Sequence, residues 1–114
     1  PVAVLLHAGF WREQYTLELS EDLALIAHLG SSGCQFNRNG TWYGAARAVS
    51  HLKRKYQYLV DRKLAPTAEA FIERAASESS ASGKSYLVKC SGQPEVRSAE
   101  WFRAELAKVR QSRP

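Results

Sequence analysis

The 114-residue sequence predicts an α+β domain, mostly α, with about four helices, a small antiparallel sheet of two or three strands, and one disulfide. Three observations predict this class. Apolar residues recur at three- and four-residue spacing in four segments. Short runs typical of strands lie between these segments and are bounded by glycine, asparagine or proline. Two cysteines, Cys34 and Cys90, each lie at the edge of one of these runs.

Length and composition are those of one globular domain over residues 1–114. With 45% hydrophobic and 24% charged residues, the chain has enough apolar surface to form a core. The longest apolar run, Val2 to Leu6, is far too short to cross a bilayer, so we expect no membrane span. Residues 1–19 form an N-terminal extension whose pattern fits either a strand or a helix. Residues 20–110 form the clearly punctuated core.

The first helix of that core is expected to begin after Ser20. A serine is a favourable N-cap, and Glu21 and Asp22 lie in the first turn, where the helix dipole favours negative charge. Gly30 or Gly33 ends the helix. Its expected apolar stripe contains Leu23, Ile26 and Ala27.

The short strands are expected on either side of a tight turn and again later in the chain. Residues 34–36 read as one strand, Asn39-Gly40 as a turn, and Trp42-Tyr43 as the returning strand of a hairpin. After a small-residue loop over 77–83, residues 86–90 read as a further strand. Its alternation places Tyr86, Val88 and Cys90 on one face.

Three more helices complete the prediction. One spans about 44–63, one starts at Pro66-Thr67 with Thr67 as its cap, and the last is capped by Ser98. Their expected inward-facing residues keep helical spacing. In chain order these are Ala46, Val49, Leu52, Tyr56, Leu59 and Val60; then Ala68, Phe71, Ile72 and Ala75; then Phe102, Leu106 and Val109.

The two cysteines are either a bridge or two buried thiols. Adjacent strands would bring their β-carbons within the roughly 4 Å that a bridge needs. A disulfide would indicate an oxidising compartment, whereas two reduced thiols would fit a cytosolic protein. We expect Cys34 and Cys90 to be bonded.

The positive charge is concentrated in the middle of the chain. Residues 34–63 hold seven of the 16 basic residues and one acidic residue, Asp61. This asymmetry favours an anionic partner, although a solvated helix surface would have the same composition.

No catalytic or metal-binding motif stands out. Residues 82–85, Ser-Gly-Lys-Ser, resemble the end of a phosphate-binding loop, but Glu78 occupies the position of its first glycine. The histidines at 7, 28 and 51 lack the spacing of a zinc site. We therefore expect a protein that is not an enzyme and that uses no metal or cofactor.

The expected partner-binding surface combines the hairpin with the outer side of the long helix. Aromatic and arginine side chains dominate the energetics of protein interfaces. We do not expect nucleic-acid binding, because the cations of residues 53–55 fan around the helix. The surface residues are Trp42, Tyr43, Arg47, Lys55, Tyr58 and Arg62.

Several strings of the core occur together in a known family. They are SGCQF at 32–36, RNGTWY at 38–43, HLKRKY at 51–56, AEAFI at 68–72, SSASGKSYLVKC at 79–90 and WFRAEL at 101–106. In these strings the chain resembles the DUF5329 family of small exported bacterial proteins of unknown function, over about four-fifths of its length. Residues 1–19 have no counterpart in that pattern. The resemblance implies a periplasmic location and a paired Cys34–Cys90.

The resemblance also extends to immunity proteins that pair with effectors of type IV secretion systems. It implies a periplasmic inhibitor that binds and neutralises a cognate antibacterial toxin. Two alternatives stay open: a module that binds or hydrolyses peptidoglycan, and a housekeeping periplasmic protein. The sequence does not define an oligomeric state.

Overall fold

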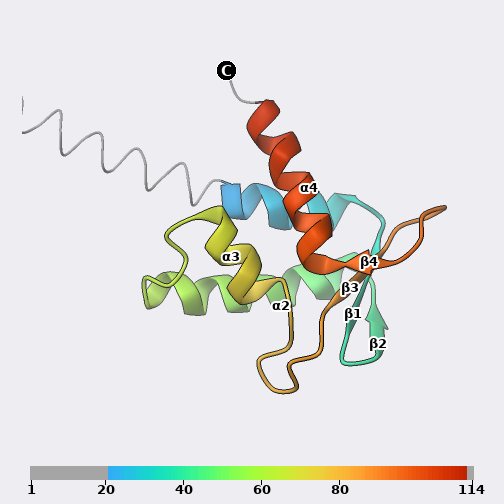
Figure 1. Cartoon of the computed structure of the whole chain (residues 1–114), viewed down its shortest axis with the longest axis horizontal. Coiled ribbons are helices and arrows are strands. Elements are labelled where there is room, and N and C mark those ends of the chain that lie inside the picture. Colours follow the sequence, from blue (N-terminus) through green and yellow to red (C-terminus); the bar gives the residue numbers. More distant parts are fainter. Residues whose placement is uncertain (1–20, 113–114) are drawn as a thin grey trace, which may run out of the picture.

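The structure is a computed structural model that describes residues 21–112. Residues 1–20 lie outside the described part, and with them the N-terminal extension and the expected cap Ser20. Residues 21–31 are helical. They are followed by β1 (Gln35–Arg38), β2 (Thr41–Tyr43), α2 (Ala45–Asp61), α3 (Ala68–Ala75), β3 (Leu87–Lys89), β4 (Val96–Arg97) and α4 (Ser98–Gln111), shown in Figure 1. The expected α+β class is confirmed.

The sheet has four antiparallel strands in the order β2-β1-β3-β4. The hairpin predicted at Asn39-Gly40 joins β1 to β2, and both turn residues have positive φ, as such turns require. β4 is one strand more than the sequence predicted. It is two residues long and pairs with β3 directly before α4 begins.

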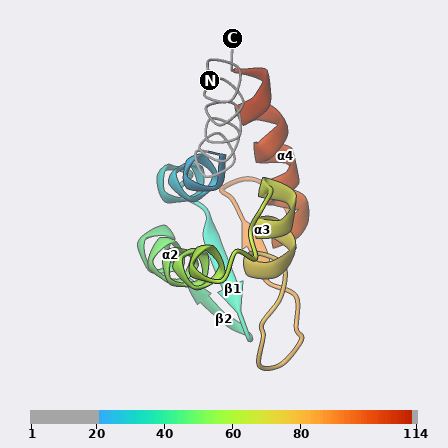
Figure 2. The same ribbon diagram turned by 90° about the vertical axis from the view of Figure 1, so that its left-hand side faces the viewer.

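The helices pack on one face of the sheet. Register aligns Tyr43, Phe36, Val88 and Val96 across the four strands, and Phe36 and Val88 are fully buried beneath the helices. α2 lies against β1, and α4 lies against β3 and β4, with α3 between the two helices. The helix of residues 21–31 runs beside α2 in both views (Figures 1 and 2), where Gly30 permits close approach to Val49.

The predicted core is largely correct, with three exceptions in the first two helices. Leu23 is 47% exposed and Ala27 is also exposed, whereas Leu25 and Leu29 are fully buried beside Ile26. In α2 the buried alanine is Ala48 and not Ala46. The helix of residues 21–31 therefore presents a face rotated from the one chosen by spacing, because its other apolar residues also repeat at helical intervals. In α2 the expected face is kept, since Leu52 and Leu59 are buried as predicted.

The cap of α3 is as expected, and the cap of α4 is not. The Thr67 hydroxyl accepts a hydrogen bond from the Ala70 amide at 3.0 Å. For α4 the N-cap is Arg97, and Ser98 is the first helical residue. Ser98 is instead buried and tied to the sheet, since its amide donates to the Tyr86 carbonyl.

Replacing Thr67 with alanine should lower the free energy of unfolding by about 1 kcal/mol, because the Ala70 amide loses its acceptor. Chemical denaturation followed by circular dichroism would measure this difference. Thr67→Ser keeps the hydroxyl and should retain most of the stability. Equal losses in the two variants would show that the hydroxyl does not stabilise α3.

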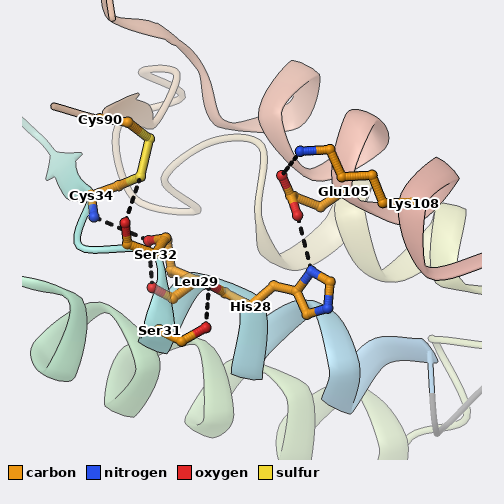
Figure 3. The surroundings of a disulfide bond; sticks show 8 residues. All are labelled: His28, Leu29, Ser31, Ser32, Cys34, Cys90, Glu105 and Lys108. Atoms are coloured by element: carbon orange, nitrogen blue, oxygen red, sulfur yellow. Dashed lines mark hydrogen bonds and ion pairs between the residues drawn. A yellow bond between two sulfur atoms is a disulfide. The ribbon is translucent and has the colours of Figure 1, made fainter. Parts of the chain in front are cut away.

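The disulfide between Cys34 and Cys90 is present, with Cα atoms 4.1 Å apart (Figure 3). It joins the residue before β1 to the residue after β3. The Ser32 hydroxyl accepts from the Cys34 amide and donates to the Leu29 carbonyl. The bridge is thereby fastened to the end of the 21–31 helix, while His28 on that helix contacts Glu105 of α4.

Candidate functional site: a basic cleft along α2

Two adjoining hollows line one side of α2, with volumes of about 750 and 60 Å³. They share Arg38, His51 and Arg54, and together we name them the basic cleft. The remaining lining residues come from β1, β2, α2, α3 and the loop before β3. They are Phe36, Tyr43, Arg47, Ala48, Lys55, Tyr58, Leu59, Arg74 and Ser80.

The charge of the basic cleft has one sign. Five of its lining residues are cationic, namely Arg38, Arg47, Arg54, Lys55 and Arg74. None of the lining residues contributed by the described part of the chain is acidic. Like charges held close together repel one another, and a concave wall concentrates their field. Such an arrangement favours an anion in the cleft.

The α2 face that lines the cleft has a simple register. Arg47, His51, Arg54 and Tyr58 follow one another at intervals of four, three and four residues, so they lie in one row along the helix. Lys53 lies off this row and does not line the cleft. These four side chains therefore form one continuous surface along α2, on the side of the helix that lines the basic cleft.

A buried tyrosine hydroxyl forms part of the wall beneath this row. Tyr86 is 1% exposed, and its oxygen lies 3.1 Å from Lys55 Nζ and 3.2 Å from His51 Nε2. Because an ammonium group can only donate, the Tyr86 oxygen accepts from Lys55. The phenolic proton is then available for His51 Nε2 when the imidazole is neutral. The His51 ring also meets the Tyr86 ring edge-on.

His51 is neutral at physiological pH in this setting. Burial, together with the positive charges of Arg38, Lys55 and Arg54, lowers the pKa of its imidazole from 6.5 to about 4, and burial is the largest of these causes. Cations therefore surround His51 from β1 and from its own helix. An anion bound beside these cations would offset their part of the shift in the His51 pKa, whereas the part caused by burial would remain.

Cation–aromatic pairs flank the cleft. The Arg47 guanidinium lies 5.4 Å from the centre of the Tyr43 ring, and the Arg62 guanidinium lies 3.7 Å from the centre of the Tyr58 ring. Tyr58 is 53% exposed. Of the six residues expected to bind a partner, Tyr43, Arg47, Lys55 and Tyr58 line the cleft, and Arg62 stacks on its edge.

Trp42 lies elsewhere. Successive strand residues point to opposite faces of a sheet, so Trp42 faces away from the side on which Tyr43 lies. It is half-buried and does not line the basic cleft. The expected role of Trp42 in partner binding stays a prediction separate from the cleft.

Sequence reasoning missed Arg38, His51, Arg54 and Arg74 as members of this site. The four- and three-residue spacing of Arg47, His51 and Arg54 was a usable signal for one helix face. No local signal connects Arg38 on β1 or Arg74 on α3 to that face, because only the packing of these elements on α2 brings them there.

Several acidic residues form ion pairs with side chains of α4, outside the lining of the basic cleft. Arg110 of α4 binds the carboxylates of both Glu21 and Glu69, and Glu105 binds His28 and Lys108. Burial alone would raise the pKa of Glu105, but its hydrogen bonds from His28 and Lys108 outweigh this and lower it. Within residues 21–112, no group of three or more histidine, cysteine, aspartate or glutamate side chains is arranged to hold a metal ion.

The fold and the cleft define a small disulfide-bonded α+β domain with a basic cleft along α2. Residues 18–110 match a family described as a family of unknown function, DUF5329, and the chain belongs to that family. No curated protein and no solved structure matches the chain. None of the described helices is long and apolar enough to cross a membrane.

Proposed function

We propose that this protein is a periplasmic inhibitor that binds and neutralises an antibacterial toxin delivered by a secretion system. In this proposal it acts by occupying the toxin's surface, without chemistry of its own, and it docks through the basic cleft. The observation that carries the binding role is that residues 21–112 contribute five cations and no acidic residue to the lining of the basic cleft. The resemblance to immunity proteins suggests the toxin as partner.

Two further features support a rigid binding scaffold outside the cytosol. The Cys34–Cys90 bridge is the kind of bond that persists in oxidising compartments such as the periplasm. The Tyr43–Arg47 and Tyr58–Arg62 pairs offer large, partly preordered side chains, which are the usual anchors of protein interfaces.

The alternative of a peptidoglycan hydrolase receives no comparable support. A glycoside hydrolase needs one carboxyl group that is protonated near neutral pH. Glu69, one of the two glutamates that bind Arg110, does not offer one, because the hydrogen bond from Arg110 lowers its pKa. Their guanidinium contact also suits a structural clamp joining three helices.

Coexpression with candidate effectors, sought first among the genes that neighbour this one, tests the proposal. Cells that direct the effector to their periplasm should stop growing, and coexpressed wild-type protein should restore growth and co-purify with the effector. Arg47→Glu/Arg54→Glu should lose this protection, with affinity lowered roughly 100-fold or more, because like charges then face an acidic partner.

The matched control is Lys89→Glu/Arg103→Glu, which makes the same change in net charge at exposed positions outside the cleft. This control should protect as well as the wild type. Growth arrest that is equal with and without the wild-type protein would contradict the inhibitor role. Full protection by the cleft variant would move the docking surface elsewhere.

A further inference from the structure

We propose that Arg38 and Arg54 form a seat for carboxylate side chains, and that this seat receives an acidic segment of the protein partner lying lengthwise along α2. The inference deepens the proposed function and rests on it for the identity of the partner. The chemistry of the seat itself can be tested without that partner.

The first argument is that the two guanidinium groups are unoccupied. Neither the Arg38 nor the Arg54 guanidinium forms a hydrogen bond or an ion pair with another residue in the described range 21–112. The other cations nearby do have contacts. Lys55 donates to the Tyr86 hydroxyl and to the Glu78 carbonyl, and Arg74 donates to the Leu64 carbonyl. Arg47 stacks on the Tyr43 ring. Arg38 and Arg54 are therefore the cleft cations that have no hydrogen bond, ion pair or ring contact within residues 21–112.

The second argument is the position of the pair. Arg38 and Arg54 line both hollows, so they mark the junction of the cleft. Arg38 is half-buried on β1 and Arg54 is exposed on α2, so the two approach the junction from different elements. Arginine presents a planar set of donors that binds a carboxylate through two parallel hydrogen bonds, which suits one acidic side chain at each guanidinium.

The third argument is the length of the surface. From Arg47 to Arg62 the helix rises about 22 Å, the span of about seven extended residues. Cation–aromatic pairs stand at both ends of this span. A single small oxyanion would fill only the junction and leave both ends unused. A polypeptide segment would use the whole length, which favours protein carboxylates over a free phosphate.

The pKa of His51 should report whether the seat is occupied. The groups acting on His51 are Arg38 from β1, Arg54 and Lys55 from α2, and the Tyr86 hydroxyl beside β3. Carboxylates bound at Arg38 and Arg54 would offset their charges, so the pKa of His51 should rise from about 4 when the seat is filled. Linkage then requires that binding takes up protons at pH values between the His51 midpoints of the free and the bound protein.

Nuclear magnetic resonance titration of the full chain with acetylated, amidated hexaglutamate provides the test. The peptide should perturb the signals of Arg38, Arg54 and His51 in a saturable way at low salt. We expect a dissociation constant of roughly 0.1–1 mM that weakens several-fold at physiological salt, as partly exposed ion pairs do. The His51 titration midpoint should move upward in the presence of the peptide.

Arg38→Gln/Arg54→Gln should weaken hexaglutamate binding tenfold or more, whereas Lys89→Gln/Arg103→Gln, with the same change in net charge, should bind like the wild type. Arg54→Gln alone, at an exposed helix position, should weaken binding several-fold even if the double variant unfolds. Equal losses in the cleft and control variants would overturn the seat, because the attraction would then follow net charge alone. An unmoved His51 midpoint would also overturn it.

Two other ligands complete the experiment. Inorganic phosphate or a short single-stranded DNA that saturates the junction at lower concentration than hexaglutamate would overturn the choice of a protein carboxylate. In the growth assay, full protection by Arg38→Gln/Arg54→Gln would overturn the seat and leave the inhibitor role intact. Failure of the wild-type protein to protect would overturn the inhibitor role, while the peptide titration would still decide the chemistry of the seat.

Discussion

Replacing Cys34 and Cys90 together with alanine is expected to lower the free energy of unfolding by about 4 kcal/mol. The two cysteines are 56 residues apart in sequence, so the bridge removes a large amount of chain freedom from the unfolded state. A loss of this size is a large share of the 5–15 kcal/mol that typically stabilises a domain. Urea denaturation of the variant and the wild type would measure it.

The position of the bridge adds to this expectation. Cys34 is 3% exposed, and the bond holds the start of β1 to the end of β3. The strands β1 and β3 are the two central strands of the sheet. Loosening their ends should therefore also affect the contact between β1 and α2, from which the cleft is built.

Reduction of the wild-type protein is the matched control. Dithiothreitol should lower the unfolding midpoint of the wild type to about that of the Cys34→Ala/Cys90→Ala variant and should leave the variant unchanged. A variant within about 1 kcal/mol of the wild type would contradict the entropic role of the bridge. Two titratable thiols in denatured, unreduced protein isolated from the periplasm would contradict the bond itself.

The elements that local sequence determines were predicted well. In α3 the cap Thr67 and all four inward-facing residues are where the pattern placed them, because Pro66 and the cap define the start and a helix of eight residues leaves little choice of face. The Asn39-Gly40 turn was equally clear, since few residue pairs adopt positive φ at both positions.

The elements that depend on tertiary packing were predicted less well from the sequence. Leu23 and Leu25 are chemically alike, and only the neighbouring helix and α4 decide which of them faces inward. β4 has two residues and exists because β3 offers a free edge, which no pattern within Val96-Arg97 reveals. The basic cleft has the same origin, since Arg38 and Arg54 are 16 positions apart in sequence and line the same hollows only because β1 packs against α2.

Replacing Arg110 should destabilise the protein by removing two ion pairs at once. Its guanidinium donates to both carboxylate oxygens of Glu21, at 2.9 and 3.1 Å, and to both of Glu69, at 2.8 and 3.1 Å. One side chain of α4 thus joins the 21–31 helix and α3. The two acids differ in burial, since the Glu21 side chain is 3% exposed and the Glu69 side chain is 60% exposed.

This difference in burial sets the expected magnitudes. Arg110→Gln should lower the free energy of unfolding by about 2–3 kcal/mol, because a buried carboxylate loses the cation that compensates its charge. This expected loss is at or below the lower end of the range that is usual for breaking a buried ion pair, because the Arg110 side chain is itself 40% exposed. Glu69→Gln should cost less than about 1 kcal/mol, as an exposed ion pair does. Chemical denaturation at pH 7 would measure both.

A double replacement tests the cause. If the penalty comes from the charge of Glu21, then Arg110→Gln/Glu21→Gln should recover much of the stability that Arg110→Gln loses. Arg110→Lys should fall between Arg110→Gln and the wild type, because an ammonium group keeps the charge but cannot bind both carboxylates through paired hydrogen bonds. A double variant as unstable as the sum of its single variants would assign the loss to packing instead.

The pH dependence gives an independent check on the same clamp. The hydrogen bond from Arg110 lowers the pKa of Glu69 below its ordinary value of 4.5. A carboxyl group with a lowered pKa contributes stability that is complete above its unfolded pKa and is lost as the pH falls through its folded pKa. The wild type should therefore lose stability on acidification below about pH 4.5, and Arg110→Gln should lose less over the same interval. If the free energy of unfolding falls in parallel with pH for the two proteins, the ion pairs of Arg110 do not contribute to acid sensitivity. If the two curves converge at low pH, the Arg110 guanidinium supplies part of the free energy that holds α3 against α4.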